Sequence, residues 1–136
     1  MKKLDNFSNC LTILANADFK MAETNDIYRT GVIGQFNLTF ELAWKALQEI
    51  MRKHGVEDSS TGSPREILQL GYKFGFINDS ETWLLMLKKR NTSDHIYNEE
   101  EVDELILLIR DSFIPAFTAL KDTLARKLDE AESNWE

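Results

Sequence analysis

The sequence has 136 residues, of which 43% are hydrophobic and 29% charged, and its formal net charge is −7. Length and composition predict one folded domain over residues 1–136, and the acidic charge disfavours a general nucleic-acid coat, since such binding depends on neutralising phosphates. The longest apolar runs, at 83–87 and 105–109, are far shorter than the ~20 residues of a membrane helix. With a lone cysteine, Cys10, and no export signal, we expect a cytoplasmic protein that does not enter a membrane.

Apolar residues recur at intervals of three and four along the chain, which predicts helices and no strands. The first helix ends before Ala22, and its apolar stripe consists of Leu4, Phe7, Leu11 and Leu14. The second and longest helix has a stripe made of Ile33, Phe36, Phe40, Ala43, Leu47 and Ile50. Its end is predicted at Lys53 and His54, before Gly55, so that His54 is a C-terminal charge rather than a ligand.

The second half of the chain contains three further helix starts. Ser63, with Pro64 and Glu66 after it, has the pattern of a capping box and opens a short helix. Asp79 or Ser80 caps a helix that runs to Arg90 and directs Trp83, Leu84 and Leu87 toward the core. A last helix begins near Asn98, with three glutamates in its first turn, and is kinked at Pro115. The expected fold is all-α, an up-and-down bundle of four main helices plus a short extra helix.

The segment RNTSDHIY at 90–97 combines residues suited to phosphoryl chemistry. His95 could exchange a proton with a ribose or leaving oxygen, and Arg90 could hold a phosphate through its planar fork. On a continuous helix the two would lie about 140° apart, so cooperation requires a helix break or a second copy of the chain. Lys88, Lys89 and Arg90 form either a local anion site or a solvated helix end.

Other candidate ligands are sparse. No His, Cys or carboxylate cluster has metal-ligand spacing, and the proposed chemistry requires no metal or other cofactor. Trp44 and Lys45 could line a cleft, since an aromatic ring can stack on a base and a lysine can meet a phosphate. Trp44 could equally be a core residue.

The segment at 90–97 resembles the R-x4-6-H motif of the HEPN superfamily, in the R-x4-H-x-Y form of HepT-like toxins. Four surrounding segments resemble the nucleotidyltransferase substrate-binding protein branch of that superfamily: FNLTFELAWKAL at 36–47, SPREIL at 63–68, WLLMLKKRN at 83–91 and IPAF at 114–117. The resemblance extends from about Phe7 to Leu124. It implies a helical bundle that forms a homodimer and is encoded beside a minimal nucleotidyltransferase.

The resemblance also implies roles for individual residues. In a toxin of this family Arg90 and His95 form the catalytic pair of a metal-independent endoribonuclease, and Asn91 orients the substrate. Tyr97 is the residue to which the antitoxin nucleotidyltransferase transfers AMP, which would block an RNA site. The alternative implied role is a non-catalytic subunit that presents a nucleotide or other substrate to the nucleotidyltransferase.

Overall fold

The computed structural model describes the backbone of residues 1–93 and 98–133, and the side chains of 1–90 and 98–133. Every regular element within these ranges is a helix, which confirms the all-α prediction. In chain order the elements are α1 (Lys2–Ala15), α2 (Phe19–Thr24), α3 (Asp26–Lys53), α4 (Pro64–Lys73), α5 (Ser80–Ser93), α6 (Glu99–Leu108), the π-helical turn η1 (Ile109–Phe113) and α7 (Ile114–Ser133).

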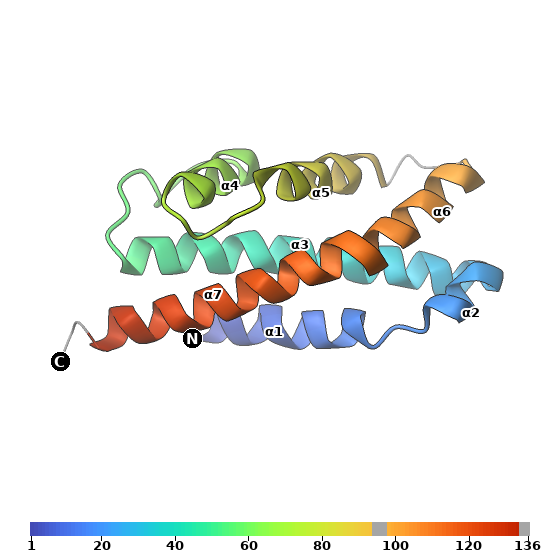
Figure 1. Cartoon of the computed structure of the whole chain (residues 1–136), viewed down its shortest axis with the longest axis horizontal. Coiled ribbons are helices and arrows are strands. Elements are labelled where there is room, and N and C mark those ends of the chain that lie inside the picture. Colours follow the sequence, from blue (N-terminus) through green and yellow to red (C-terminus); the bar gives the residue numbers. More distant parts are fainter. Residues whose placement is uncertain (94–97, 134–136) are drawn as a thin grey trace.

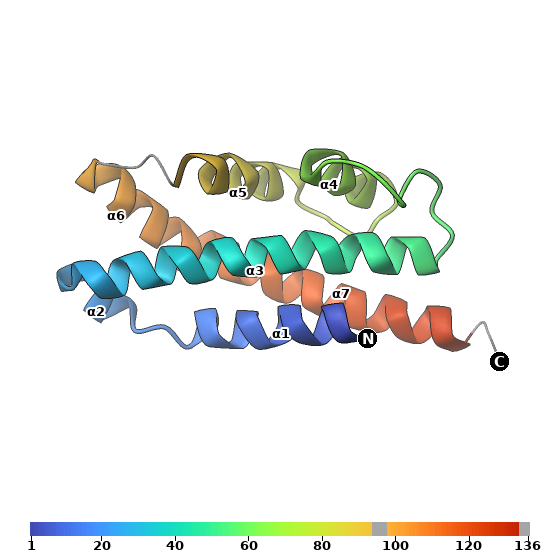
Figure 2. The same ribbon diagram turned by 180° about the vertical axis from the view of Figure 1, so that it is seen from behind.

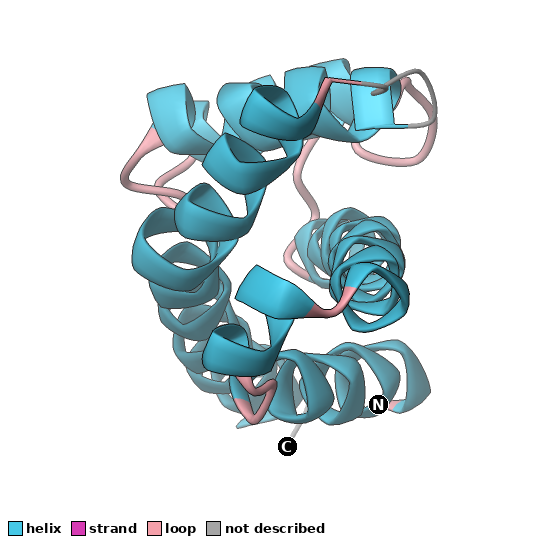
Figure 3. Cartoon of the chain, turned by 90° about the vertical axis from the view of Figure 1, so that its right-hand side faces the viewer, coloured by secondary structure: helices cyan, strands magenta, loops and turns pink. Residues whose placement is uncertain are grey.

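The four long segments run alternately in opposite directions (Figure 1). These segments are α1, α3, α5, and the nearly continuous run of α6, η1 and α7. In the end-on view of Figure 3, α3 lies on the side of the bundle opposite α6 and α7. From behind, α3 is the foremost helix along its whole length, with α4 and α5 above it and α1 below (Figure 2). The arrangement is the predicted up-and-down bundle.

Aromatic side chains form the centre of the core. Phe36 stacks on Phe113 with ring centroids 5.2 Å apart, which joins α3 to η1. Phe117 of α7 meets Phe7 of α1 and Trp83 of α5 edge-on, at 6.1 and 5.5 Å. Each such side chain stabilises the fold by roughly 1.5–3 kcal/mol when fully buried. The cluster therefore ties all four long segments to one another.

Helix ends agree well with their sequence signals. Ser63 and Glu66 form the predicted capping box at the start of α4. Asn98 caps α6 by accepting the N–H of Glu100 at 2.8 Å. His54 is the C-cap of α3, as predicted, but its Nε2 also lies 2.6 Å from the carbonyl oxygen of Lys127. That contact joins the end of α3 to α7, and local spacing could not have predicted it.

Several details differ from the sequence-based predictions. The short helix α2 was not predicted; Asp18 caps it, and Ala22 is its buried residue. Ile33 and Leu84 are only partly buried, whereas Val32 and Met86 take core positions. Val32 is the direct neighbour of Ile33, so the first error shifts the buried face by one residue. Met86 is two positions from Leu84, and the buried face of this helix consists of Trp83, Met86 and Leu87, with Leu84 at its margin.

The long C-terminal helix is irregular just before Pro115. The N–H of Ile114 donates to the carbonyl of Ile109, five residues earlier, which makes the turn π-helical. Pro115 lies in the first turn of α7 and has no N–H to offer the carbonyl four residues before it. The wider π turn accommodates that missing donor where a kink was expected. No helix in residues 1–93 or 98–133 combines the length and apolar character needed to cross a bilayer.

Candidate functional site

The centre of the candidate site is Arg90, in the last turns of α5. Its guanidinium donates from a terminal nitrogen to Oε2 of Glu41 at 2.7 Å, and Glu41 lies in the middle of α3. The Arg90 side chain is 34% exposed, so it is both anchored and accessible to solvent. The sequence folds this way because the buried face of α5, with Trp83, Met86 and Leu87, turns toward the core while Arg90 lies at its margin.

The Glu41 carboxylate also binds a second cation. Its Oε1 lies 3.3 Å from Nζ of Lys45, one turn further along α3. One carboxylate therefore bridges two cationic side chains that come from different helices. The Arg90 contact is a charge-assisted hydrogen bond, which is shorter and stronger than a neutral one, whereas the Lys45 contact is a longer ion pair within the helix.

Trp44 lies beside this network rather than in an open cleft. Its ring is partly buried and packs against the core, with Nζ of Lys45 at 5.9 Å from the ring centroid. Its Nε1 is buried and has no hydrogen-bond partner among the described residues. Trp44 therefore packs against the core, which is one of the two roles considered from the sequence. Its indole N–H lies near the candidate site and has no partner among the described residues.

The other predicted site residues divide into two groups. Nζ of Lys89 lies 3.7 Å from Glu104 of α6, so this lysine links α5 to the next long helix. Asn91 lies in the helical backbone of α5, but its side chain is outside the described residues. His95 and Tyr97 also lie outside them. The described part of the site therefore contains Arg90, Lys89, Trp44 and Lys45 and adds Glu41.

The start of α5 supports the helix that carries Arg90. The Asp79 carboxylate accepts hydrogen bonds from the hydroxyl and the backbone N–H of Thr82, and these bonds lower the pKa of Asp79. A carboxylate at this end also interacts favourably with the positive end of the helix dipole. Among the described residues, no three His, Cys, Asp or Glu side chains gather in a group that could hold a metal ion.

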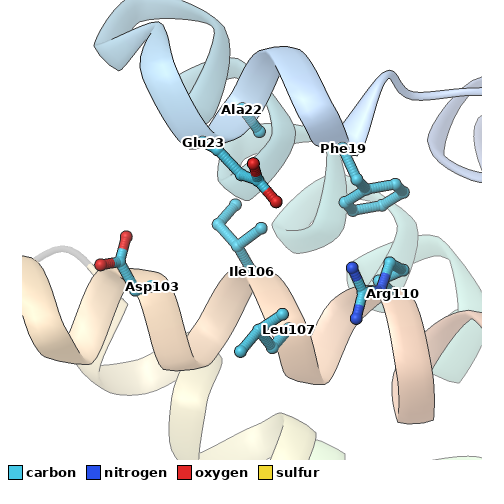
Figure 4. Close-up of a pocket in the computed structure, with 7 residues that line it drawn as sticks. All are labelled: Phe19, Ala22, Glu23, Asp103, Ile106, Leu107 and Arg110. Carbon is cyan, nitrogen blue, oxygen red and sulfur yellow. The ribbon is translucent and has the colours of Figure 1, made fainter.

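A separate pocket of about 210 Å³ lies between α2 and α6 (Figure 4). Asp103 and Arg110 lie at opposite ends of the group of lining residues, with Arg110 near Phe19 and Glu23 between the two ends. Arg110 donates to both carboxylate oxygens of Asp111, which lowers the pKa of Asp111. None of Arg90, Lys89, Trp44 or Lys45 lines this pocket. We therefore assign it no part in the candidate site.

The outward face of α3 borders the candidate site and is apolar. Ile27 is 87% exposed and Leu38 is 48% exposed, and both lie on this face together with Gly31 and Gly34. A Cβ added at either glycine would have no neighbour within 4 Å. Helical geometry places Glu41 at the edge of the same face. Gly31 and Gly34 both lie within the first ten residues of this 28-residue helix, where glycine is less favourable than alanine.

Sequence reasoning missed Glu41. Its spacing of four from Lys45 predicts an ion pair within the helix, but nothing in the local sequence indicates Arg90, which is 49 positions away. Only the packing of α5 beside α3 brings the two side chains together.

The fold and site define an all-α, up-and-down bundle with an arginine at a helix end, held beside an acidic and a basic residue of the longest helix. The chain belongs to the nucleotidyltransferase substrate-binding protein family, because the family profile described as "Nucleotidyltransferase substrate binding protein like" matches residues 2–126. This confirms the family resemblance found in the sequence.

Two matches from Haemophilus influenzae, one of sequence and one of structure, show what the chain is similar to. The first is named "Probable ribonuclease HepT"; it is 23% identical over 111 residues, covering 80% of this chain and 76% of the relative. The second is a solved structure described as revealing the fold of a substrate-binding domain of a nucleotidyltransferase. It is 21% identical, covers 90% of this chain and 98% of its own, and has a TM-score of 0.76. At this identity the second likeness establishes the fold alone.

Proposed function

We propose that this protein is the toxin of a two-protein toxin–antitoxin pair, and that it is a metal-independent endoribonuclease. The observation that carries the proposal is the position of Arg90: it is accessible, held at the seam of α3 and α5, and directly precedes the segment that contains His95. A similarity to a protein named as a probable ribonuclease supports the same reaction class.

In the proposed reaction a ribose 2′-hydroxyl attacks the neighbouring phosphorus and the 5′ oxygen of the next nucleotide leaves. His95 takes the hydroxyl proton or returns one to the leaving oxygen. Arg90 stabilises the negative charge that develops on the phosphoryl oxygens, and Asn91 orients the phosphate. Lys89, Lys45 and the ring of Trp44 contact the RNA next to the scissile bond. No step needs a metal ion.

The proposed regulation is AMP transfer to Tyr97 by a minimal nucleotidyltransferase partner. The Tyr97 phenol oxygen attacks the α-phosphorus of ATP, pyrophosphate leaves, and the phenol proton passes to solvent. The added phosphate and adenosine would place bulk and negative charge two residues from His95, which disfavours RNA binding. We place the pair in the cytoplasm, where its RNA substrate and ATP are both present.

We further propose that the active form is a homodimer joined through the outward face of α3. Ile27, Gly31, Gly34 and Leu38 are separated by four, three and four positions, so this pattern is the same in both directions. A twofold axis that crosses α3 between the two glycines would bring the face onto itself, as symmetric dimers require. The glycines would permit close approach at the crossing point, and the larger residues would fill the space where the helices diverge.

Mass measurement by light scattering tests the dimer. We expect the Leu38→Lys variant to be monomeric, because it buries a charge at the contact. Leu107→Lys is a matched control on α6, since Leu107 is also 48% exposed. A monomeric wild-type protein, or dimers of both variants, would contradict this interface.

The experiment that tests the catalytic proposal is an RNA-cleavage assay on protein purified without its partner. We expect Arg90→Ala and His95→Ala to abolish cleavage, whereas Arg52→Ala, which removes a half-exposed arginine near the end of α3, keeps it. Incubation with the nucleotidyltransferase and ATP should add one or more AMP units and stop cleavage. Tyr97→Phe should prevent both effects, and Tyr72→Phe, at an exposed tyrosine, should prevent neither. An unmodified wild-type protein that leaves RNA intact would refute the proposal.

A second candidate function is supported by the description of the family and of the solved structure, which both name substrate binding for a nucleotidyltransferase. In that role Arg90 and Lys45 hold a phosphate of a nucleotide or other acceptor without cleaving it. The same assays separate the two functions. Tight nucleotide binding that is lost in Arg90→Ala, with no cleavage by the wild-type protein, would favour the binding subunit.

A further inference from the structure

We infer that Glu41 is a positioning residue for Arg90, and that its carboxylate shifts the balance between anchoring this arginine and releasing it to a phosphate. The inference deepens the proposed function and rests on it, because it assigns Arg90 to the site that receives the RNA backbone. No local sequence feature indicates this role; the contact between α3 and α5 does.

The first argument is the geometry of the contact. Glu41 Oε2 and the Arg90 terminal nitrogen are 2.7 Å apart, which is the length of a charge-assisted hydrogen bond. An arginine side chain has many rotamers, and one strong contact near its tip removes much of that freedom. A guanidinium that is already oriented loses less entropy when it binds a phosphate, so the contact favours catalysis.

The second argument is the accessibility of all three partners. Arg90, Glu41 and Lys45 have side chains that are 34%, 28% and 45% exposed. A phosphate arriving from solvent therefore reaches the same cations that Glu41 bridges, and it competes with the carboxylate for them. Glu41 thus weakens anion binding while it orients Arg90. Removing its carboxylate should therefore raise the affinity for an anion but lower kcat.

The chain contains a matched control for Glu41. Glu49 lies two turns further along α3, is 27% exposed, and also contacts two cations, Lys3 at 3.4 Å and Arg52 at 3.3 Å. Replacing Glu49 removes the same charge and the same type of contact from the same helix. Eight residues of helix separate the two sites by about 12 Å, which exceeds the screening length of ~10 Å at 0.1 M salt.

The first measurement is the Kd for a 2′-deoxy oligonucleotide, which lacks the attacking hydroxyl and cannot be cleaved. Its affinity for wild-type protein, Glu41→Gln, Glu49→Gln and Arg90→Ala is followed by fluorescence anisotropy at 0.1 M salt. Removing one negative charge about 7 Å from a bound phosphate in water, with the same screening length of ~10 Å, predicts roughly 1.5- to 2-fold tighter binding by Glu41→Gln. Glu49→Gln should bind as the wild type does, and Arg90→Ala should bind more weakly.

The second measurement separates positioning from charge alone. In Glu41→Gln we expect kcat for RNA cleavage to fall at least tenfold while KM falls or stays unchanged, and Glu49→Gln should alter neither. The NMR signal of the Arg90 Nε–H group gives a readout that does not depend on turnover. It should move or broaden in Glu41→Gln and remain in place in Glu49→Gln.

The outcomes distinguish the inference from the proposed function. If Arg90→Ala binds the oligonucleotide and cleaves RNA as well as the wild type does, Arg90 is not in the site and both ideas fail. A second outcome is that Arg90→Ala loses binding while Glu41→Gln and Glu49→Gln have the same affinity and the same Arg90 Nε–H signal. In that case only the inference about Glu41 is refuted, and the proposed function stands. A higher kcat in Glu41→Gln would also refute positioning, because it would make the carboxylate only a competitor.

Discussion

Gly71 offers a sharp test of how α4 packs against the long helix α3. A Cβ built at this position would lie 2.9 Å from Cδ2 of Leu47 and 3.2 Å from Cδ1 of Ile77. Leu47 is fully buried and Ile77 nearly so, which leaves these side chains little space to move away. The Gly71 carbonyl also accepts the N–H groups of Phe76 and Ile77, at 2.8 and 3.2 Å, so the backbone is held in place.

The Gly71→Ala substitution should therefore destabilise the protein. Forcing one extra methyl group into a packed core costs roughly 1–3 kcal/mol. Alanine regains about 0.5–1 kcal/mol because it is the better helix former. The expected net loss in the free energy of unfolding is about 1–2 kcal/mol, measured by urea denaturation with circular dichroism at an unchanged m-value.

A second background shows whether the clash is the cause. Leu47→Val shortens the side chain and removes both Cδ atoms, so Gly71→Ala introduced into that variant should cost at least about 1 kcal/mol less than in the wild type. The reasoning is refuted if Gly71→Ala is as stable as the wild type, or if its cost is the same in both backgrounds.

Three further changes test the site and its supports. Asp79→Asn should lower the free energy of unfolding at pH 7 by about 0.3–1 kcal/mol through weaker interaction with the helix dipole. Because hydrogen bonds lower the folded pKa of Asp79, this difference should be present above about pH 4 and disappear as the pH falls through that pKa. Urea denaturation at several pH values that shows a constant difference would contradict this expectation. Arg29→Met should lower the free energy of unfolding by about 2–4 kcal/mol and raise the rate of amide hydrogen exchange in α2. The buried guanidinium donates to the carbonyls of Ala22 and Glu23 at 2.9 and 3.0 Å and lies 3.0 Å from the Asp103 carboxylate. Unchanged exchange would show that these contacts do not hold α2 in place. Trp44→Phe should change the free energy of unfolding by less than about 1 kcal/mol. The loss of buried ring area is offset by the removal of a buried donor that has no partner among the described residues. A loss above about 2 kcal/mol would show that the indole N–H is hydrogen-bonded.

The candidate site was only partly accessible to sequence reasoning. Arg90 was predicted from its local motif, and its side chain is 34% exposed near the end of α5. Glu41 was not found, because its partner is distant in sequence and the contact depends on how two helices pack. His95 and Tyr97 remain predictions from the motif, since both lie outside the described residues.

The sequence by itself determined the helices and most of their ends. Their periodicity of three and four, the capping box at Ser63 and the cap at Asn98 are local signals, because they depend on side chains within a turn of the backbone that they satisfy. Tertiary structure decided which faces are buried at the margins, as at Val32 and Met86. It also decided that Arg90 meets Glu41 and that His54 meets Lys127, because contacts between helices depend on packing geometry that no single segment encodes.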